Sequence, residues 1–172
     1  MEQLTSLIRD IPDFPEPGVV FKDITPVLAD GPAFAALVDA MAEPFRDSGV
    51  TKVAGIEARG FTLATPVADR LGAGFIPVRK PGKLPYETVR EDYTLEYGTD
   101  ALEIHTDSAQ RGERVLLVDD VIATGGTAAA AIRLLRKIGA DVIGISVFIE
   151  LAFLDGAQML DGVPLHALVT YD

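Results

Sequence analysis

The sequence contains no cysteine and no tryptophan, and only 7% of its 172 residues are aromatic. Without cysteine there can be no disulfide framework, no thiolate metal site and no thiol nucleophile. The absence of cysteine also fits the reducing environment of the cytoplasm, where we expect the protein to be found.

Positive charge is also scarce. The chain has 15 Lys and Arg residues against 26 Asp and Glu residues, which gives a formal net charge of −11. Nucleic acids and anionic membranes are bound chiefly by clustered Lys and Arg, so neither is expected as a partner. Any anionic substrate must be held by local donors that work against an unfavourable overall field.

Long hydrophobic runs are missing as well. No apolar stretch approaches the roughly 20 residues that a membrane-spanning helix needs. The first residues, MEQLTSLIRD, lack the basic start and the apolar stretch of a signal peptide. We therefore expect no contact with a membrane.

Aliphatic residues and turn formers are plentiful, and the length suits one compact domain with a full core. Uninterrupted apolar runs are typical of parallel strands that are buried on both faces. Such runs occupy residues 52–57, 74–80, 114–120 and 141–150. Helical patterns ending in glycine lie between the first two runs and between the last two. This alternation predicts an α/β fold, with a doubly wound, mainly parallel sheet flanked by helices.

Other segments carry weaker patterns. Residues 2–10 indicate a short amphipathic helix, and residues 31–48 a longer one that starts near Pro32. The proline-rich residues 11–28 predict a rigid, extended connection without long regular elements. Residues 81–105 mix charges, prolines and tyrosines, and they predict an antiparallel flap hairpin.

The stretch VLLVDDVIATGGT at residues 115–127 carries the strongest functional signal. A buried strand ends in Asp119 and Asp120 and then enters a loop of small residues that leads into a helix. Gly125 and Gly126 would let the backbone approach a ligand closely, and Thr127 could cap the helix or bond a phosphate oxygen. Two acids beside a phosphate loop leave two interpretations. Either they only end a strand and cap a turn, or they lie about a sugar's length from a bound phosphate, where they can accept hydrogen bonds from ribose hydroxyls or help to hold a hydrated Mg²⁺.

Several other site types are absent from the sequence. The loop lacks the spacing and the lysine of a Walker A motif, and no GxGxxG follows a strand. No GxSxG or HExxH motif occurs either, and His105 and His166 fit ordinary strand positions. The nucleoside triphosphatase and dinucleotide-binding interpretations therefore lose most of their support, and hydrolase and zinc chemistry are not supported.

The strand, acid pair and loop resemble the motif with which type I phosphoribosyltransferases bind phosphoribosyl pyrophosphate (PRPP). The blocks FPEPGVVFKDITPVL, IEARGF, RKPGKLP, LEYG and VDDVIATGGT also occur in the order and approximate spacing of the members of this family that use adenine. The resemblance implies a single phosphoribosyltransferase domain over residues 1–172. Its base-recognition segment would cover about 11–28 and its flap about 81–105.

The resemblance also implies a role for each matching residue. The 5′-phosphate would be bound by Ala123, Thr124, Gly125, Gly126 and Thr127. Asp119 and Asp120 would contact the ribose hydroxyls, and Arg59 would sit on the pyrophosphate loop that spans Glu57 to Gly60. Arg79, Lys80 and Lys83 match basic residues that reach pyrophosphate, commonly across a dimer interface. Apart from the resemblance, Arg59 could be a surface ion pair and the basic cluster a solvated charge run.

For the base, Phe21 matches the residue that stacks on adenine, while Val20 and Lys22 would offer backbone groups to its edge. Glu96 matches a flap carboxylate that approaches the purine. Catalytic roles are thus implied for Arg59, Glu96, Asp119 and Asp120. On the residues alone, Phe21 could equally pack in the core and Glu96 be an exposed hairpin charge.

The activity implied is transfer of the phosphoribosyl group of PRPP to adenine, giving AMP and pyrophosphate. Mg²⁺ is the expected cofactor, held mainly by PRPP and close to Asp119 and Asp120 rather than by a cage of protein side chains. A homodimer is the expected assembly. Two alternatives stay open: a transferase for hypoxanthine, guanine, xanthine or orotate, and a non-catalytic regulator that senses PRPP or a nucleotide.

Overall fold

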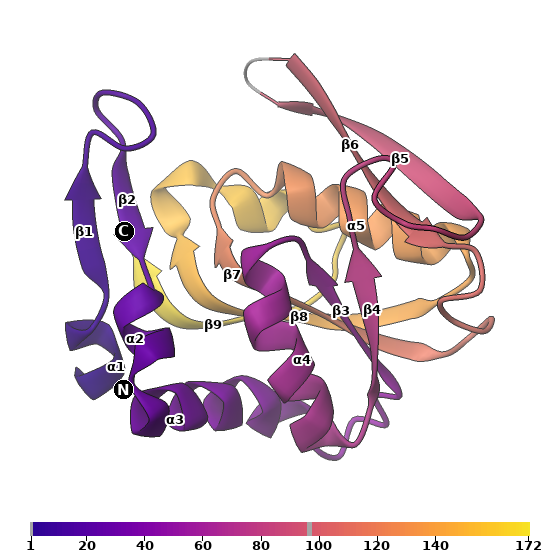
Figure 1. Cartoon of the computed structure of the whole chain (residues 1–172), viewed down its shortest axis with the longest axis horizontal. Coiled ribbons are helices and arrows are strands. Elements are labelled where there is room, and N and C mark those ends of the chain that lie inside the picture. Colours follow the sequence, from indigo (N-terminus) through magenta and orange to yellow (C-terminus); the bar gives the residue numbers. More distant parts are fainter. Residues whose placement is uncertain (1, 96–97) are drawn as a thin grey trace.

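The computed structural model of the protein describes residues 2–95 and 98–172. Its centre is a five-stranded sheet in the order β4-β3-β7-β8-β9, and every neighbouring pair is parallel (Figure 1). The strands are β3 (Lys52–Ile56), β4 (Gly74–Val78), β7 (Arg114–Ile122), β8 (Asp141–Leu151) and β9 (Leu165–Tyr171). The predicted fold class, a doubly wound parallel sheet, is confirmed.

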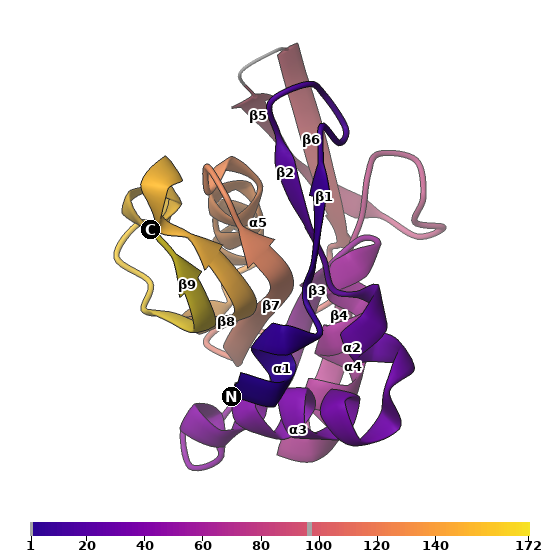
Figure 2. The ribbon, with the colours of Figure 1, turned by 90° about the vertical axis from the view of Figure 1, so that its left-hand side faces the viewer.

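Helices cover both faces of this sheet (Figures 1 and 2). They are α1 (Glu2–Ser6), α2 (Thr25–Ala29), α3 (Gly31–Ala42), α4 (Arg59–Leu71) and α5 (Gly126–Lys137), with short 3-10 helices η1 (Glu43–Phe45), η2 (Ala152–Leu154) and η3 (Gly156–Met159). One hydrophobic cluster joins α5 to the sheet and to the flap. A second cluster joins α1, α3 and α4 to the opposite face. None of the helices in the described part of the chain could span a membrane.

Helix α4 packs very close to β3. A Cβ atom placed on Gly55 would lie 2.5 Å from the Cβ of Ala64, so glycine is the residue that permits this approach. The amphipathic pattern of α4 buries Leu63, Ala64 and Val67 against the sheet. This packing fixes the first turn of α4, which begins at Arg59, at the end of β3.

The strand order reverses between β3 and β7. From β3 the chain passes through α4 to β4 on one side, whereas from β7 it passes through α5 to β8 on the other. In open parallel sheets, the crevice at such a reversal lies beyond the carboxyl ends of the strands and is the usual ligand site. The loops after β3 and β7 flank this crevice.

Two antiparallel hairpins project beyond the sheet on either side of that crevice (Figure 1). One pairs β1 (Arg9–Pro12) with β2 (Val20–Asp23), and the other, the flap, pairs β5 (Thr88–Leu95) with β6 (Gly98–His105). The flap hairpin agrees with the sequence prediction. Residues 11–28 contain no long regular element, as predicted, but they are not simply an extended connection, because this segment contributes to a hairpin and forms the five-residue helix α2.

The prolines of that segment occupy positions that regular elements tolerate. Pro12 ends β1, Pro15 and Pro17 lie in the hairpin loop, and Pro26 lies in the first turn of α2. Strand β9, which was not among the predicted parallel strands, is a half-buried edge strand. Its apolar residues are interrupted by polar ones, so it lacked the continuous run that marked the buried strands.

Candidate active site

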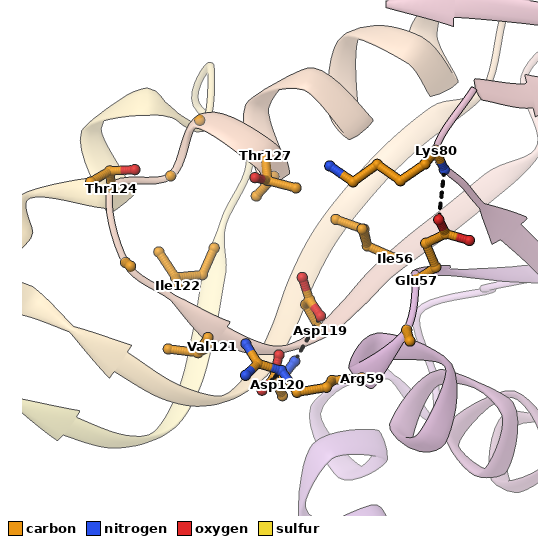
Figure 3. Close-up of a pocket in the computed structure, with 15 residues that line it drawn as sticks. Ile56, Glu57, Arg59, Lys80, Asp119, Asp120, Val121, Ile122, Thr124 and Thr127 are labelled. Carbon is orange, nitrogen blue, oxygen red and sulfur yellow. Dashed lines mark hydrogen bonds and ion pairs between the residues drawn. The ribbon is translucent and has the colours of Figure 1, made fainter. Parts of the chain in front are cut away.

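The loops after β3 and β7 line one pocket of about 290 Å³ (Figure 3). The segment after β3 contributes Glu57, Ala58 and Arg59. The end of β7, the loop after it and the first turn of α5 together contribute the whole stretch from Asp119 to Ala128. Ile56 and Lys80 complete the lining. Residues that are about 60 positions apart in the sequence therefore meet at the reversal point of the sheet.

The acid pair lies near the end of β7. Asp120 is 3% exposed and pairs with Arg59, whose Nε lies 2.8 Å from its Oδ2. The backbone N–H of Asp120 donates to Asp119 Oδ1 at 3.0 Å. Figure 3 shows Asp119 and Asp120 on β7 among the residues that line the pocket, with Arg59 beside Asp120. Arg59 therefore does form an ion pair, but its partner is a buried acid inside the pocket rather than a residue on the surface.

Burial raises the pKa of Asp119 well above its ordinary value, and the neighbouring charge of Asp120 raises it further. Burial also raises the pKa of Asp120, although the Arg59 guanidinium opposes the shift. Because Asp120 has this cation beside it, we assign the charge of the pair to Asp120 and the more easily protonated position to Asp119.

Gly60 allows the first turn of α4 to lie against the acid pair. A Cβ atom at this position would be 2.7 Å from Asp119 Oδ1 and 3.2 Å from the carbonyl oxygen of Val118. Any side chain here would displace Asp119 or the start of α4. The IEARGF block therefore has a structural reason for its glycine.

The loop before α5 is held by a contact between backbones. Gly125 has a φ of 78°, in the left-handed region that favours glycine. A Cβ atom on Gly156, in η3, would lie 2.0 Å from the carbonyl oxygen of Ala123 and 2.8 Å from the nitrogen of Gly125. Gly156 thus supports the loop from outside the pocket. This role was not predicted, since a lone glycine at position 156 of the sequence carries no signal of such a contact.

Glu57 connects the pyrophosphate loop to the end of β4. Its carboxylate accepts a hydrogen bond from Arg79 Nε at 2.6 Å and another from the Lys80 backbone N–H at 3.1 Å. Burial opposes ionisation of Glu57, but the hydrogen bonds from Arg79 and Lys80 prevail and lower its pKa. Arg79 therefore stabilises the loop through Glu57 rather than lining the pocket, whereas Lys80 does line it.

Two of the three basic residues predicted to reach pyrophosphate, Arg79 and Lys83, do not line the pocket. Lys83 is exposed in the loop before β5 and does not line the pocket within its own chain. Glu96, the flap carboxylate predicted to approach the purine, lies outside the described residues.

A second pocket of about 240 Å³ lies beside the first. It is lined mainly by apolar side chains: Val19, Val20, Phe21, Lys22, Arg59, Val121, Ala123, Leu151 and Leu154. The Arg59 guanidinium lies 4.9 Å from the centre of the Phe21 ring, within the range of a cation–π contact. The Lys22 ammonium is turned toward Asp10, at 2.8 Å, and toward the Tyr171 ring, at 4.1 Å.

The two pockets share Arg59, Val121 and Ala123. One is polar, with acids and a glycine-rich loop, and the other is apolar with an aromatic ring. Val121, Leu151 and Leu154 were not predicted as site residues, because isolated aliphatic residues in or after a buried strand have the pattern of core residues. A ligand with a phosphorylated sugar at one end and a flat apolar ring at the other would fit across this junction.

The acids do not form a metal cage. Within residues 2–95 and 98–172, no group of three or more His, Cys, Asp or Glu side chains is placed to hold a metal ion. Asp120 is engaged by Arg59, and burial favours the protonated form of Asp119. This donor set fits a hydrated ion that arrives on substrate phosphates better than an ion bound by the protein itself.

The model of the phosphoribosyl transferase domain family matches residues 27–158 of the chain. The match covers the parallel sheet up to β8 and both loops of the polar pocket. The chain therefore belongs to the phosphoribosyltransferase family, as its sequence motifs indicated.

Relatives that are similar to nearly the whole chain include several adenine phosphoribosyltransferases. The one from Streptomyces coelicolor is 58% identical over 173 aligned residues, which cover 98% of this chain and 95% of that relative. The solved structure of the Rhodothermus marinus protein is 52% identical and superposes with a TM-score of 0.94, covering 99% of this chain and 97% of that one. The Saccharomyces cerevisiae protein, solved with an imino-altritol bisphosphate and adenine, is 37% identical with a TM-score of 0.92, and 97% of each chain is covered.

Proposed function

We propose that the protein transfers the 5-phosphoribosyl group of PRPP to adenine, forming AMP and pyrophosphate. One observation carries the proposal: a polar pocket with a phosphate-type loop and an apolar pocket with an aromatic ring meet at Arg59, Val121 and Ala123. The reaction joins a sugar phosphate to a flat base, so its C1′ atom must lie at such a junction. The choice of adenine rests on the whole-length similarity to adenine phosphoribosyltransferases.

In this proposal the 5′-phosphate lies on residues 123–127, at the N-terminus of the 12-residue helix α5. Free backbone N–H groups and the helix dipole favour an anion there. Asp119 and Asp120 accept hydrogen bonds from the ribose hydroxyls. Arg59 and Lys80, which line the same pocket, face the pyrophosphate.

Adenine is placed in the apolar pocket, stacked on Phe21. Strand β2 pairs with β1 alone among the described strands, so its other edge leaves backbone groups of Val20 and Lys22 for the polar edge of the base. The Lys22 ammonium already contacts Asp10 and Tyr171. This arrangement is consistent with a contact between adenine and the backbone of Lys22. Leu151 and Leu154 line the same pocket and add apolar surface.

During the reaction the C1′–O bond to pyrophosphate breaks, the C1′–N9 bond forms, and the N9 proton of adenine is released. Positive charge builds on the ribose before the new bond is complete, as in glycoside hydrolysis. The Asp120 carboxylate lies where it stabilises this charge, and the cations of Arg59 and Lys80 stabilise the leaving pyrophosphate. No protein nucleophile is needed.

Mg²⁺ is the proposed cofactor, and when bound with PRPP it would supply positive charge that neutralises the pyrophosphate. Asp119 and Asp120 are the residues that would lie near its hydration shell. We further propose that residues 1–172 form one phosphoribosyltransferase domain, with base recognition at about 11–28 and the flap at about 81–105, with Glu96 approaching the purine. The expected context is a homodimer in the cytoplasm.

The decisive experiment measures AMP and pyrophosphate formation from PRPP and Mg²⁺ with adenine, hypoxanthine, guanine, xanthine and orotate as separate substrates. We expect adenine to give the highest kcat/KM. Faster turnover with hypoxanthine would overturn the choice of base. Binding of PRPP without release of pyrophosphate from any base would favour a nucleotide-sensing regulator instead.

A further inference from the structure

Lys80 stands where several parts of the polar pocket meet. It follows β4, and its backbone N–H is fixed by Glu57 on the pyrophosphate loop, at 3.1 Å. Its side chain is 37% exposed and extends into the pocket toward Thr127 (Figure 3). A lysine side chain has a long, flexible stem, so its ammonium needs further contacts to hold one position.

Two residues of the flap supply those contacts. The Lys80 ammonium donates to the carboxylate of Asp100 on β6, and to the Tyr93 hydroxyl on β5 at 3.2 Å. Tyr93 and Asp100 are direct cross-strand partners in the flap, so their side chains lie on the same face of the hairpin. The Tyr93 hydroxyl also donates to Asp100 Oδ2 at 3.2 Å.

This pair is itself held in place. Tyr93 is 6% exposed and belongs to the hydrophobic cluster that joins the flap to α5. Asp100 accepts a further hydrogen bond from the Ala101 backbone N–H at 2.8 Å. Thr127, in the first turn of α5, lies with its hydroxyl 3.5 Å from the Tyr93 hydroxyl. The contacts therefore run from the pyrophosphate loop through Lys80 and the flap to the phosphate loop.

We propose that Asp100 and Tyr93 are positioning residues for PRPP, which hold the Lys80 ammonium in the polar pocket with one donor directed at the pyrophosphate. An ammonium group has three N–H donors. The flap pair engages two of them, and the third is left for an anion. Preorganisation of this kind reduces the ordering cost when the anion binds. The inference rests on the proposed function, because it assigns these residues to the PRPP half of that site.

The charges of the pair agree with this role. The hydrogen bond from Lys80 lowers the pKa of Asp100, so its carboxylate is ionised at neutral pH. Burial opposes the charge of Lys80, but the hydrogen bonds to Asp100 and Tyr93 prevail and raise its pKa. Lys80 therefore presents a full positive charge to the pocket.

The test uses the isosteric variant Asp100→Asn in the full-length protein. We expect the KM for PRPP and the Kd for pyrophosphate with Mg²⁺ to rise about tenfold, because a charge-assisted hydrogen bond is lost. The KM for adenine should stay within about twofold, since Lys80 does not line the base pocket. Tyr93→Phe should change the same quantities in the same direction.

Asp92→Asn is the matched control. Asp92 is also a flap carboxylate paired with a cation, Arg90, but its side chain is 66% exposed and does not line either pocket. This variant should leave the KM for PRPP unchanged. A comparable rise in both variants would show a general effect on the flap and would overturn the proposal.

A double-mutant cycle with Lys80→Met separates positioning from a direct role. If Asp100 acts through Lys80, Asp100→Asn should have no added effect on PRPP once Lys80 is Met. Additive effects, or tighter PRPP binding by Asp100→Asn alone, would overturn the inference. A wild-type protein that makes no AMP would instead refute the proposed function, so the two failures are distinguishable.

Discussion

Asp119 and Asp120 combine a functional position with an energetic cost. Asp120 is buried and Asp119 half-buried, and removing a carboxyl group from water disfavours its charged form. Asp120 is compensated by Arg59, but Asp119 accepts one backbone hydrogen bond and has a second acid as its neighbour. Residues that are costly to fold and are placed in a pocket are typical of functional sites.

Asp119→Asn should therefore lower activity without lowering stability. We expect kcat/KM for PRPP to fall about 100-fold, since Asn replaces one carboxyl oxygen with an NH₂ group, which cannot accept a hydrogen bond from a ribose hydroxyl. Circular dichroism should show an unchanged fold, because Asn preserves the shape of the side chain and can still accept from the Asp120 N–H. Near-normal kinetics would contradict a role in PRPP binding and would mean that Asp119 only ends a strand.

The pH dependence of stability gives a second readout for the same variant. A carboxyl group whose pKa is raised by folding disfavours the folded state above the pKa of the unfolded chain, about 4 for Asp. The variant should thus equal or exceed the wild type in free energy of unfolding at pH 7. The difference should disappear below about pH 4, where both states of the wild type are protonated. Urea denaturation at several pH values measures it.

Gly156→Ala tests the support behind the phosphate loop. An added methyl group would overlap the Ala123 carbonyl oxygen, so the loop must move. We expect the KM for PRPP to rise at least about tenfold, with a stability loss of about 1–3 kcal/mol from overpacking. Gly31→Ala is the control, because a Cβ there meets no atom within 4 Å. Equal effects of the two substitutions on PRPP would contradict the role of Gly156.

At the scale of elements, the units that the sequence predicted well are those in which local pattern and tertiary position agree. Strands β3, β4, β7 and β8 are buried apolar runs, and α4 and α5 have one apolar face each. The hairpin of β1 and β2 was not predicted, because its prolines suggested irregular chain and its strands have four residues each. Short paired strands depend on partners that the local sequence does not reveal.

Glu91 anchors the flap to the helix that follows the phosphate loop. Its carboxylate pairs with Arg133 at 2.6 Å and with Lys137 at 2.5 Å, one turn apart on α5. Hydrogen bonds from Lys137 and Arg133 lower the pKa of Glu91. The flap is thereby joined to the C-terminal half of α5, whereas the phosphate loop lies at the N-terminus of this helix.

Glu91→Gln should destabilise the protein by about 1 kcal/mol at pH 7, a modest value because Arg133 and Lys137 are partly exposed. Since folding lowers the pKa of Glu91, its stabilisation is complete above the ordinary glutamate pKa of about 4.3 and is lost as the pH falls through the lower folded value. Urea denaturation should show the deficit of the variant shrinking in acid. A deficit that grows in acid would contradict this assignment.

At the scale of the whole molecule, the site is assembled from segments that the sequence keeps apart. Phe21, Arg59, Lys80 and Asp120 come from four different parts of the chain, and the sheet reversal brings the last three to one pocket. Local patterns indicated the phosphate loop, and the family resemblance supplied the remaining positions. The partners within the site, such as Asp100 for Lys80, depend on side-chain packing across elements and could not be predicted.

Lys83 raises the question of whether one chain is sufficient for the reaction. PRPP is an anion and the protein has a net charge of −11, so local cations must offset the repulsion between them. Lys83, however, does not line the pocket of its own chain. It lies in an exposed loop beside Tyr86, which is 59% exposed. In the proposed homodimer, this loop would carry Lys83 to the pyrophosphate of the other subunit.

We first expect sedimentation to give twice the 18.3 kDa mass of the chain. Lys83→Ala and the double variant Asp119→Asn/Asp120→Asn should each be nearly inactive as homodimers. If Lys83 acts across the interface, a randomly exchanged equal mixture should recover about a quarter of wild-type activity, because half of the dimers are mixed and each mixed dimer has one intact site. A monomeric protein, or a mixture that stays inactive, would place Lys83 outside the partner's site.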